Sequence, residues 1–156
     1  MRTYTILLGV CLILISSCKK TSTIITGDAG SWVTSNATAS RAVACVGNVS
    51  SSEATLTAYT AYPETSTSSK MIITFYKKLP TTSGTYFIAG LNTTLTDTTQ
   101  MKVQLITSTD TYSSGGSAHI NIIVSDGKVK VIGSGINLYN SNFNTVGISI
   151  NINQLQ

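Results

Sequence analysis

From Trp32 onward, apolar and polar residues alternate with a period of two, and no long segment repeats with the helical period of about 3.6 residues. Residues 146–152 show the pattern most clearly, because every second residue is Val or Ile and those between are Gly, Ser or Asn. Such alternation is typical of antiparallel strands with one buried and one solvated face. Only 10% of residues are charged, and Ser, Thr and Asn fill most polar positions. This composition suits sheets and excludes a disordered chain, so an all-β domain is predicted.

Turn residues divide this pattern into short strands. Asp126-Gly127 lies between two alternating segments and predicts a hairpin, because Gly accepts the positive φ that such turns require. About seven to nine such strands predict an antiparallel β-sandwich, with a small β-barrel as the alternative. The sandwich is favoured because no closure pattern is visible in the sequence. Strands are expected at 54–61, 71–77, 84–89, 101–105, 118–124, 128–132 and 146–152, with one long bent strand or two short ones in 32–46.

The first eighteen residues have the organisation of a bacterial export signal. Arg2 gives a short positive region, and 6–15 is an unbroken apolar run of ten residues. That run fits the core of a signal peptide, roughly 7 to 15 residues, and is shorter than the roughly 20 needed to span a bilayer. Ile15-Ser16-Ser17-Cys18 follows directly and resembles the bacterial lipobox. The resemblance implies cleavage before Cys18 and attachment of lipid to its thiol.

These motifs divide the chain into a signal peptide over 1–17, lipidated Cys18 with a flexible tether over 18–31, and an all-β domain over 32–156. Lys19, rather than Asp, follows the cysteine. By resemblance to Gram-negative lipoproteins, this implies the outer membrane. Because no acidic run follows Cys18, the periplasmic face is favoured over the cell surface.

The expected partners follow from charge and anchoring. The formal net charge is +4, and the predicted domain has no Lys/Arg cluster, so no nucleic-acid partner is expected. The membrane, reached through the lipid on Cys18, is the first expected partner. An envelope protein or a glycan is the second.

The second half of the chain carries a further resemblance. Ser83-Gly84-Thr85-Tyr86, the alternating hairpin around 119–131 and the final strand are similar to small uncharacterised Bacteroidetes-type outer-membrane lipoproteins. Gly133-Ser134-Gly135-Ile136 stands where that family usually shows a G-x-F motif. The resemblance implies an all-β lipoprotein and supplies no activity.

One cysteine and one histidine remain in the predicted domain. Cys45 lies in the apolar run 42–46 and is interpreted as a small buried residue, and His119 as an exposed strand residue. A Cys45–His119 nucleophile pair is the alternative. One histidine and one thiol do not make a zinc site of known spacing, so neither a metal nor a cofactor is predicted.

Loop carboxylates provide another candidate chemistry. Glu53, Glu64, Asp97 and Asp110 all lie in Ser/Thr-rich segments, and a glycoside hydrolase would need two of them in one cleft. This is the least favoured function, and no catalytic residue is assigned. Asp97-Thr98-Thr99 resembles a bacterial O-glycosylation site, which makes Thr98 a candidate for modification.

Three tyrosines at expected strand ends or loops, Tyr59, Tyr62 and Tyr112, are the candidate ligand-binding residues. A tyrosine ring joins an apolar face to a polar tip and can stack on a sugar. The leading hypothesis is a non-enzymatic, lipid-anchored binding or structural accessory of the cell envelope. A glycan- or small-ligand-binding module is the first alternative, and a carboxylate-dependent hydrolase is the second.

Overall fold

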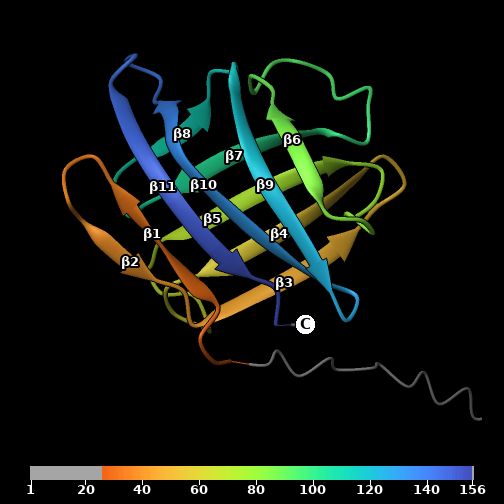
Figure 1. The fold of residues 1–156 in the computed structure, drawn as a ribbon. Coiled ribbons are helices and arrows are strands. Elements are labelled where there is room, and N and C mark those ends of the chain that lie inside the picture. The colour runs from red at the N-terminus through yellow and green to blue at the C-terminus, as the bar shows by residue number, and fades with distance from the viewer. Residues whose placement is uncertain (1–25, 156) are drawn as a thin grey trace, which may run out of the picture.

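The computed structural model describes residues 26–155 (Figure 1). Their regular structure is entirely strand, which confirms the all-β prediction. Within this range there is no helix with the length and apolarity needed to cross a membrane. The predicted signal peptide and the lipidation site Cys18 lie outside the described residues. The strands are β1 (Gly30–Thr34), β2 (Ala39–Arg41), β3 (Ala44–Val49), β4 (Glu53–Tyr59), β5 (Lys70–Tyr76), β6 (Gly84–Ile88), β7 (Gln100–Ile106), β8 (Thr111–Ser114), β9 (Ala118–Ser125), β10 (Lys128–Tyr139) and β11 (Thr145–Asn153).

All eleven strands of the described chain belong to one sheet, in the order β2-β1-β11-β10-β9-β6-β7-β5-β4-β3. β8 pairs with both β10 and β7 and so closes β6, β7, β8, β10 and β9 into a five-stranded barrel. β6 and β7 are parallel, and every other pair is antiparallel. The structure therefore corrects the preferred sandwich to the barrel alternative. It also raises the number of strands from the expected seven to nine to eleven.

A bend in β10 makes the closure possible. β10 pairs with β9 over Lys128–Ile132 and then, beyond an irregularity between Gly133 and Ile136, with β8 at Leu138 and Tyr139. Gly135 has a φ of +67°, and a Cβ on Gly133 would lie 2.5 Å from Cγ1 of Ile120. A bulge with two glycines is a common way to turn a strand at a barrel corner.

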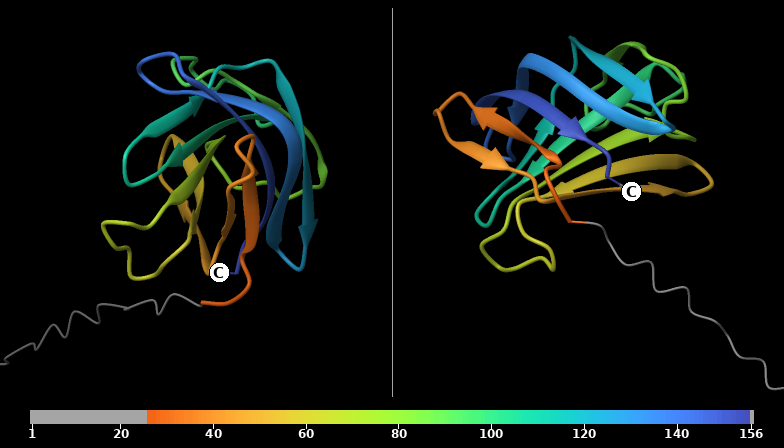
Figure 2. Two further views of the ribbon diagram at one scale, coloured as in Figure 1. Left: turned by 90° about the vertical axis from the view of Figure 1, so that its left-hand side faces the viewer. Right: turned by 60° about the horizontal axis from the view of Figure 1, so that its bottom comes forward.

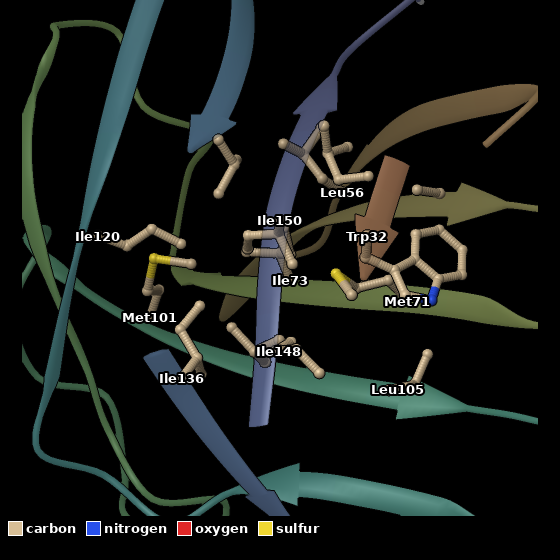
Figure 3. Close-up of a cluster of buried hydrophobic side chains, with 14 of the residues drawn as sticks. Trp32, Leu56, Met71, Ile73, Met101, Leu105, Ile120, Ile136, Ile148 and Ile150 are labelled. Carbon is tan, nitrogen blue, oxygen red and sulfur yellow. The ribbon is translucent and has the colours of Figure 1, made fainter. Parts of the chain in front are cut away.

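The rest of the sheet forms two arms that enclose one core. Figure 2 shows that the arm of β11, β1 and β2, which continues from β10, faces the arm of β5, β4 and β3, which continues from β7. Side chains of both arms and of the barrel meet between them, with Trp32 only 1% exposed (Figure 3). On β5, which lies within the sheet, the inward residues are fully buried and alternate with half-buried ones. The largest buried side chains include Trp32, Phe75, Leu56, Met71, Ile73, Met101, Leu105, Ile120, Ile122, Ile136 and Leu138.

Two local predictions can be compared directly with the structure. The Asp126-Gly127 hairpin is confirmed, because both residues have positive φ, +52° and +71°, and Ser125 pairs with Lys128. The predicted start of the domain at Trp32 is too late. Gly30 and Ser31, which were assigned to the tether, are paired with β11, and Ala29 before them is fully buried.

Candidate functional site

A large hollow on the described surface lies where the barrel closes. It is bordered by residues 90–93 after β6, by 111–115 of β8 and the segment beyond it, and by 139–143 at the turn from β10 to β11. Its volume is about 780 Å³, within the range of roughly 300–1,000 Å³ that is usual for small-molecule sites. We call it the closure groove. The elements that border it, the end of β10 and the start of β11, lie at the upper end of the molecule in Figure 1.

Phe143 is the most exposed large apolar residue of the described chain, at 86% of its surface. Its φ is +59°, a conformation that a bulky side chain rarely adopts. The side chain of Asn140 holds the turn, because its Oδ1 accepts hydrogen bonds from the backbone N–H groups of Asn142 and Asn144 at 3.0 and 2.9 Å. The N–H of Phe143 donates to the Asn140 carbonyl at 3.0 Å. The turn therefore fixes an aromatic ring in solvent at the edge of the groove.

A second aromatic ring, that of Tyr139, forms part of the groove wall and is 38% exposed. Its position depends on Gly115, since a Cβ there would lie 2.4 Å from Cε2 of Tyr139. Leu91, which is 39% exposed, lines the groove from the segment after β6. Its N–H donates to the Ser114 carbonyl at 2.9 Å. The apolar part of the groove is thus carried by backbone that is itself hydrogen-bonded.

The remaining lining is polar and uncharged. No Lys, Arg, His, Asp or Glu of residues 26–155 lines the groove. Asn92, Thr93, Thr111 and Ser141 are exposed there, and within the described chain their side chains have no hydrogen-bond partner. The groove thus combines fixed aromatic rings with free amide and hydroxyl groups.

The tyrosines predicted as ligand-binding residues lie elsewhere and do not form one platform. Tyr59 and Tyr62 are in contact, with ring centroids 5.4 Å apart in an edge-to-face arrangement. Tyr112 is paired with Leu105, on the inward-facing row of the sheet, and packs against the core. Tyr112 is therefore on the opposite face of the sheet from Tyr59, which follows the inward-facing residue Ala58.

Two of the loop carboxylates, Glu53 and Glu64, lie at opposite ends of β4. Glu53 begins β4 and pairs with Tyr76, whereas Glu64 lies beyond the far end of that strand, at least about 20 Å of strand away. Glu64 forms an ion pair with Lys70 at 2.9 Å. Asp110 accepts a hydrogen bond from Nδ2 of Asn140 at 3.3 Å. Among residues 26–155, no group of three His, Cys, Asp or Glu side chains is arranged to hold a metal ion.

Cys45 and His119 do not form a pair. Cys45 is fully buried on β3, and burial raises the pKa of its thiol to about 12. His119 is exposed on β9, with its ring edge-on to that of Phe87 at 5.5 Å. β3 and β9 are separated by four strands in the sheet. The interpretation of Cys45 as a buried residue and of His119 as an exposed one is confirmed.

Thr98, the candidate modification site, is exposed in the loop between β6 and β7. Its neighbour Thr99 donates from both Oγ1 and N–H to Oδ1 of Asp97, each at 2.7 Å. Both hydrogen bonds lower the pKa of Asp97, and the bond from the Thr99 side chain has the larger effect. The hydroxyl of Thr98 makes no such bond within the described chain, so its oxygen is accessible from solvent.

Comparison of the chain with protein-family models, curated proteins and solved structures found no match. The closure groove therefore has to be interpreted from its own geometry. Its aromatic residues were not singled out by sequence reasoning. The signal that could have found them is Asn140-Ser-Asn-Phe-Asn144, a run of turn-forming residues with one large apolar residue inside it.

Proposed function

We propose that this protein is a lipid-anchored, non-enzymatic binding protein of the bacterial envelope that presents the closure groove away from the membrane. The observation that carries the proposal is the position of the groove. It lies at the end of the molecule opposite the point where the described chain begins (Figure 1). The predicted location is the outer membrane, with the periplasmic face favoured.

The register of β11 supports this orientation. Thr145 of β11 lies beside Tyr139 at the groove, and Ile152 lies beside Gly30, where the chain joins the sheet. The seven residue steps from Thr145 to Ile152 correspond to roughly 23 Å of strand. The eight residue steps from Cys18 to Thr26 reach at most about 29 Å when fully extended. A lipid on Cys18 would therefore keep the start of the described domain within about 29 Å of the bilayer. The groove lies roughly 23 Å further along β11 from that point.

The anchor itself rests on Ile15-Ser16-Ser17-Cys18 and the apolar run before it. One acyl chain gives reversible membrane binding, whereas two or more give a durable anchor, since each buried CH₂ contributes about 0.8 kcal/mol. A binding role, rather than catalysis, is supported by the separation of Glu53 from Glu64 and by the uncharged lining of the groove. Its ordered turn also favours binding, because a preformed surface loses little entropy when a ligand binds.

The proposal can be tested in living cells of the host. Phe143 is replaced by the photoreactive residue p-benzoylphenylalanine, and the matched control carries it at Val49, which is 65% exposed and lies outside the groove. Irradiation should produce an adduct of higher mass at position 143 that the control does not form. A parallel Cys18→Ala chain should leave the membrane fraction. If positions 143 and 49 react alike, or if the Cys18→Ala chain remains with membranes, the proposal is wrong.

A further inference from the structure

We infer that the ligand of the closure groove is a neutral oligosaccharide. This inference rests on the proposed binding function and names its ligand class. It follows from three properties of the groove that lie together: a lining without charge, solvent-facing aromatic rings on rigid backbone, and polar side chains without partners.

The absence of charge narrows the ligand class. A groove for nucleic acid, phosphate or an acidic glycan would present Lys or Arg, since these side chains dominate the recognition of anions. The lining contains none, and it contains no carboxylate to attract a cation. Asp110, which holds Asn140 from outside the lining, is already engaged by that amide. An uncharged ligand is therefore favoured, because it has the lowest free-energy cost of desolvation in a groove that offers no charged partner.

The aromatic rings supply the main attractive surface. A pyranose ring has one face of C–H groups, and an aromatic ring has a negative face that attracts them. Phe143 is 86% exposed in a backbone conformation that disfavours a bulky residue. Exposure of a large apolar side chain and a positive φ both cost free energy. Such costs are concentrated at functional sites in proteins. Because Asn140 fixes the turn, the backbone that carries the ring is already in place when the ligand arrives.

The polar groups match the hydroxyls of a sugar. Asn92, Thr93, Thr111 and Ser141 provide both donors and acceptors, and their side chains have no partner within the described chain. A protein partner is less well matched, because a stable protein interface buries roughly 800 Å² per partner with an apolar centre. Among the described residues, the lining of the closure groove has only three large apolar side chains, Leu91, Tyr139 and Phe143, together with these amides and hydroxyls.

The test uses the full chain extracted from membranes in a detergent that carries no sugar headgroup. Isothermal titration calorimetry is run with six neutral probes, maltohexaose, cellohexaose, laminarihexaose, xylohexaose, mannohexaose and chitohexaose. Trigalacturonate and a heparin hexasaccharide are the charged comparisons. We expect at least one neutral probe to bind, and Phe143→Gly to weaken that binding at least tenfold. Glycine accepts the positive φ at this position, so the variant should keep the melting temperature of the wild type.

Two further variants separate stacking from general surface effects. Gly115→Ala should weaken binding by a similar factor, because the added methyl group must displace the ring of Tyr139. Val49→Ala, which removes exposed apolar surface outside the groove, should leave binding unchanged. Silence of all neutral probes, tighter binding of a charged probe, or binding that survives Phe143→Gly would each overturn the inference. Silence combined with a protein adduct at position 143 would reject the saccharide while leaving the proposed binding function standing.

Discussion

The buried Ser114 hydroxyl joins β8 to two other segments of the barrel, and the cost of its removal can be estimated. It is 3% exposed at the end of β8, and its Oγ donates to the Ala89 carbonyl at 2.7 Å. The same oxygen accepts from the N–H of Val103 at 3.2 Å. One hydroxyl thus joins β8 to β7 and to the segment that leaves β6. In Ser114→Ala, a buried N–H and a buried carbonyl both lose their partner.

The expected cost follows from these two bonds. An unsatisfied buried donor costs about 1–3 kcal/mol, and the second lost bond about 1 kcal/mol. Ser114→Ala should therefore lower the free energy of unfolding by about 2–4 kcal/mol, a large part of the roughly 5–15 kcal/mol typical of a domain. With a urea slope of about 1.5 kcal/mol per molar, the midpoint should fall by roughly 2 M.

The assay is urea unfolding followed by tryptophan fluorescence, because Trp32 is the only tryptophan and is buried in the core. Ser113→Ala, one residue earlier on the same strand, is the matched control. Its hydroxyl accepts only a long bond of 3.3 Å from the Gln104 amide, which can turn to water instead. The control should cost less than about 0.5 kcal/mol. Equal costs for the two variants would refute this account of barrel closure.

Three other predictions concern the hairpin, the buried thiol and the β6–β7 loop. Gly127→Val should cost about 1–2 kcal/mol in the same urea assay, because valine must adopt the φ of +71° there; a smaller cost would show that the turn relaxes. Burial raises the pKa of Cys45 from 9.0 to about 12, so the unfolded chain releases this proton first as the pH rises. Between these values the wild type should lose stability relative to Cys45→Ala by about 1.4 kcal/mol per pH unit, and parallel pH profiles would contradict this. If Asp97-Thr98-Thr99 is glycosylated, Thr98→Ala should lower the intact mass of protein from the native host by more than the substitution itself, whereas Thr96→Ala should not.

Most of the strands could be predicted from the sequence because their signals are local. The alternation in 146–152 and the Asp126-Gly127 turn each act within a few residues, and the structure has both. β8 could not be predicted, because its four residues do not alternate and its pairing with β7 and β10 depends on residues distant in the chain. Barrel closure requires β8 together with the bend at Gly133–Gly135, so the sequence pattern alone favoured two separate sheets.

The closure groove was missed for a related physical reason. The positions of Tyr59, Tyr62 and Tyr112 near strand ends suggested exposure, but the register turns Tyr112 toward the core. Phe143, in contrast to Tyr112, is a large apolar residue that lies in solvent. Its exposure is set by the hydrogen bonds of the Asn140 side chain to the turn, and such a bond pattern does not follow from hydrophobic periodicity.

The position of β11 has a consequence for how the molecule is made. β11 is synthesised last among the described strands, and it lies inside the sheet, between β10 and β1, rather than at an edge. Among the described strands, β1 pairs only with the three-residue β2 until β11 has been synthesised. Trp32 of β1 therefore lacks its β11 neighbour until nearly all of the described domain has been synthesised. A chain cut short before Thr145 would lack the strand that unites its two ends, and quality-control proteases should remove it.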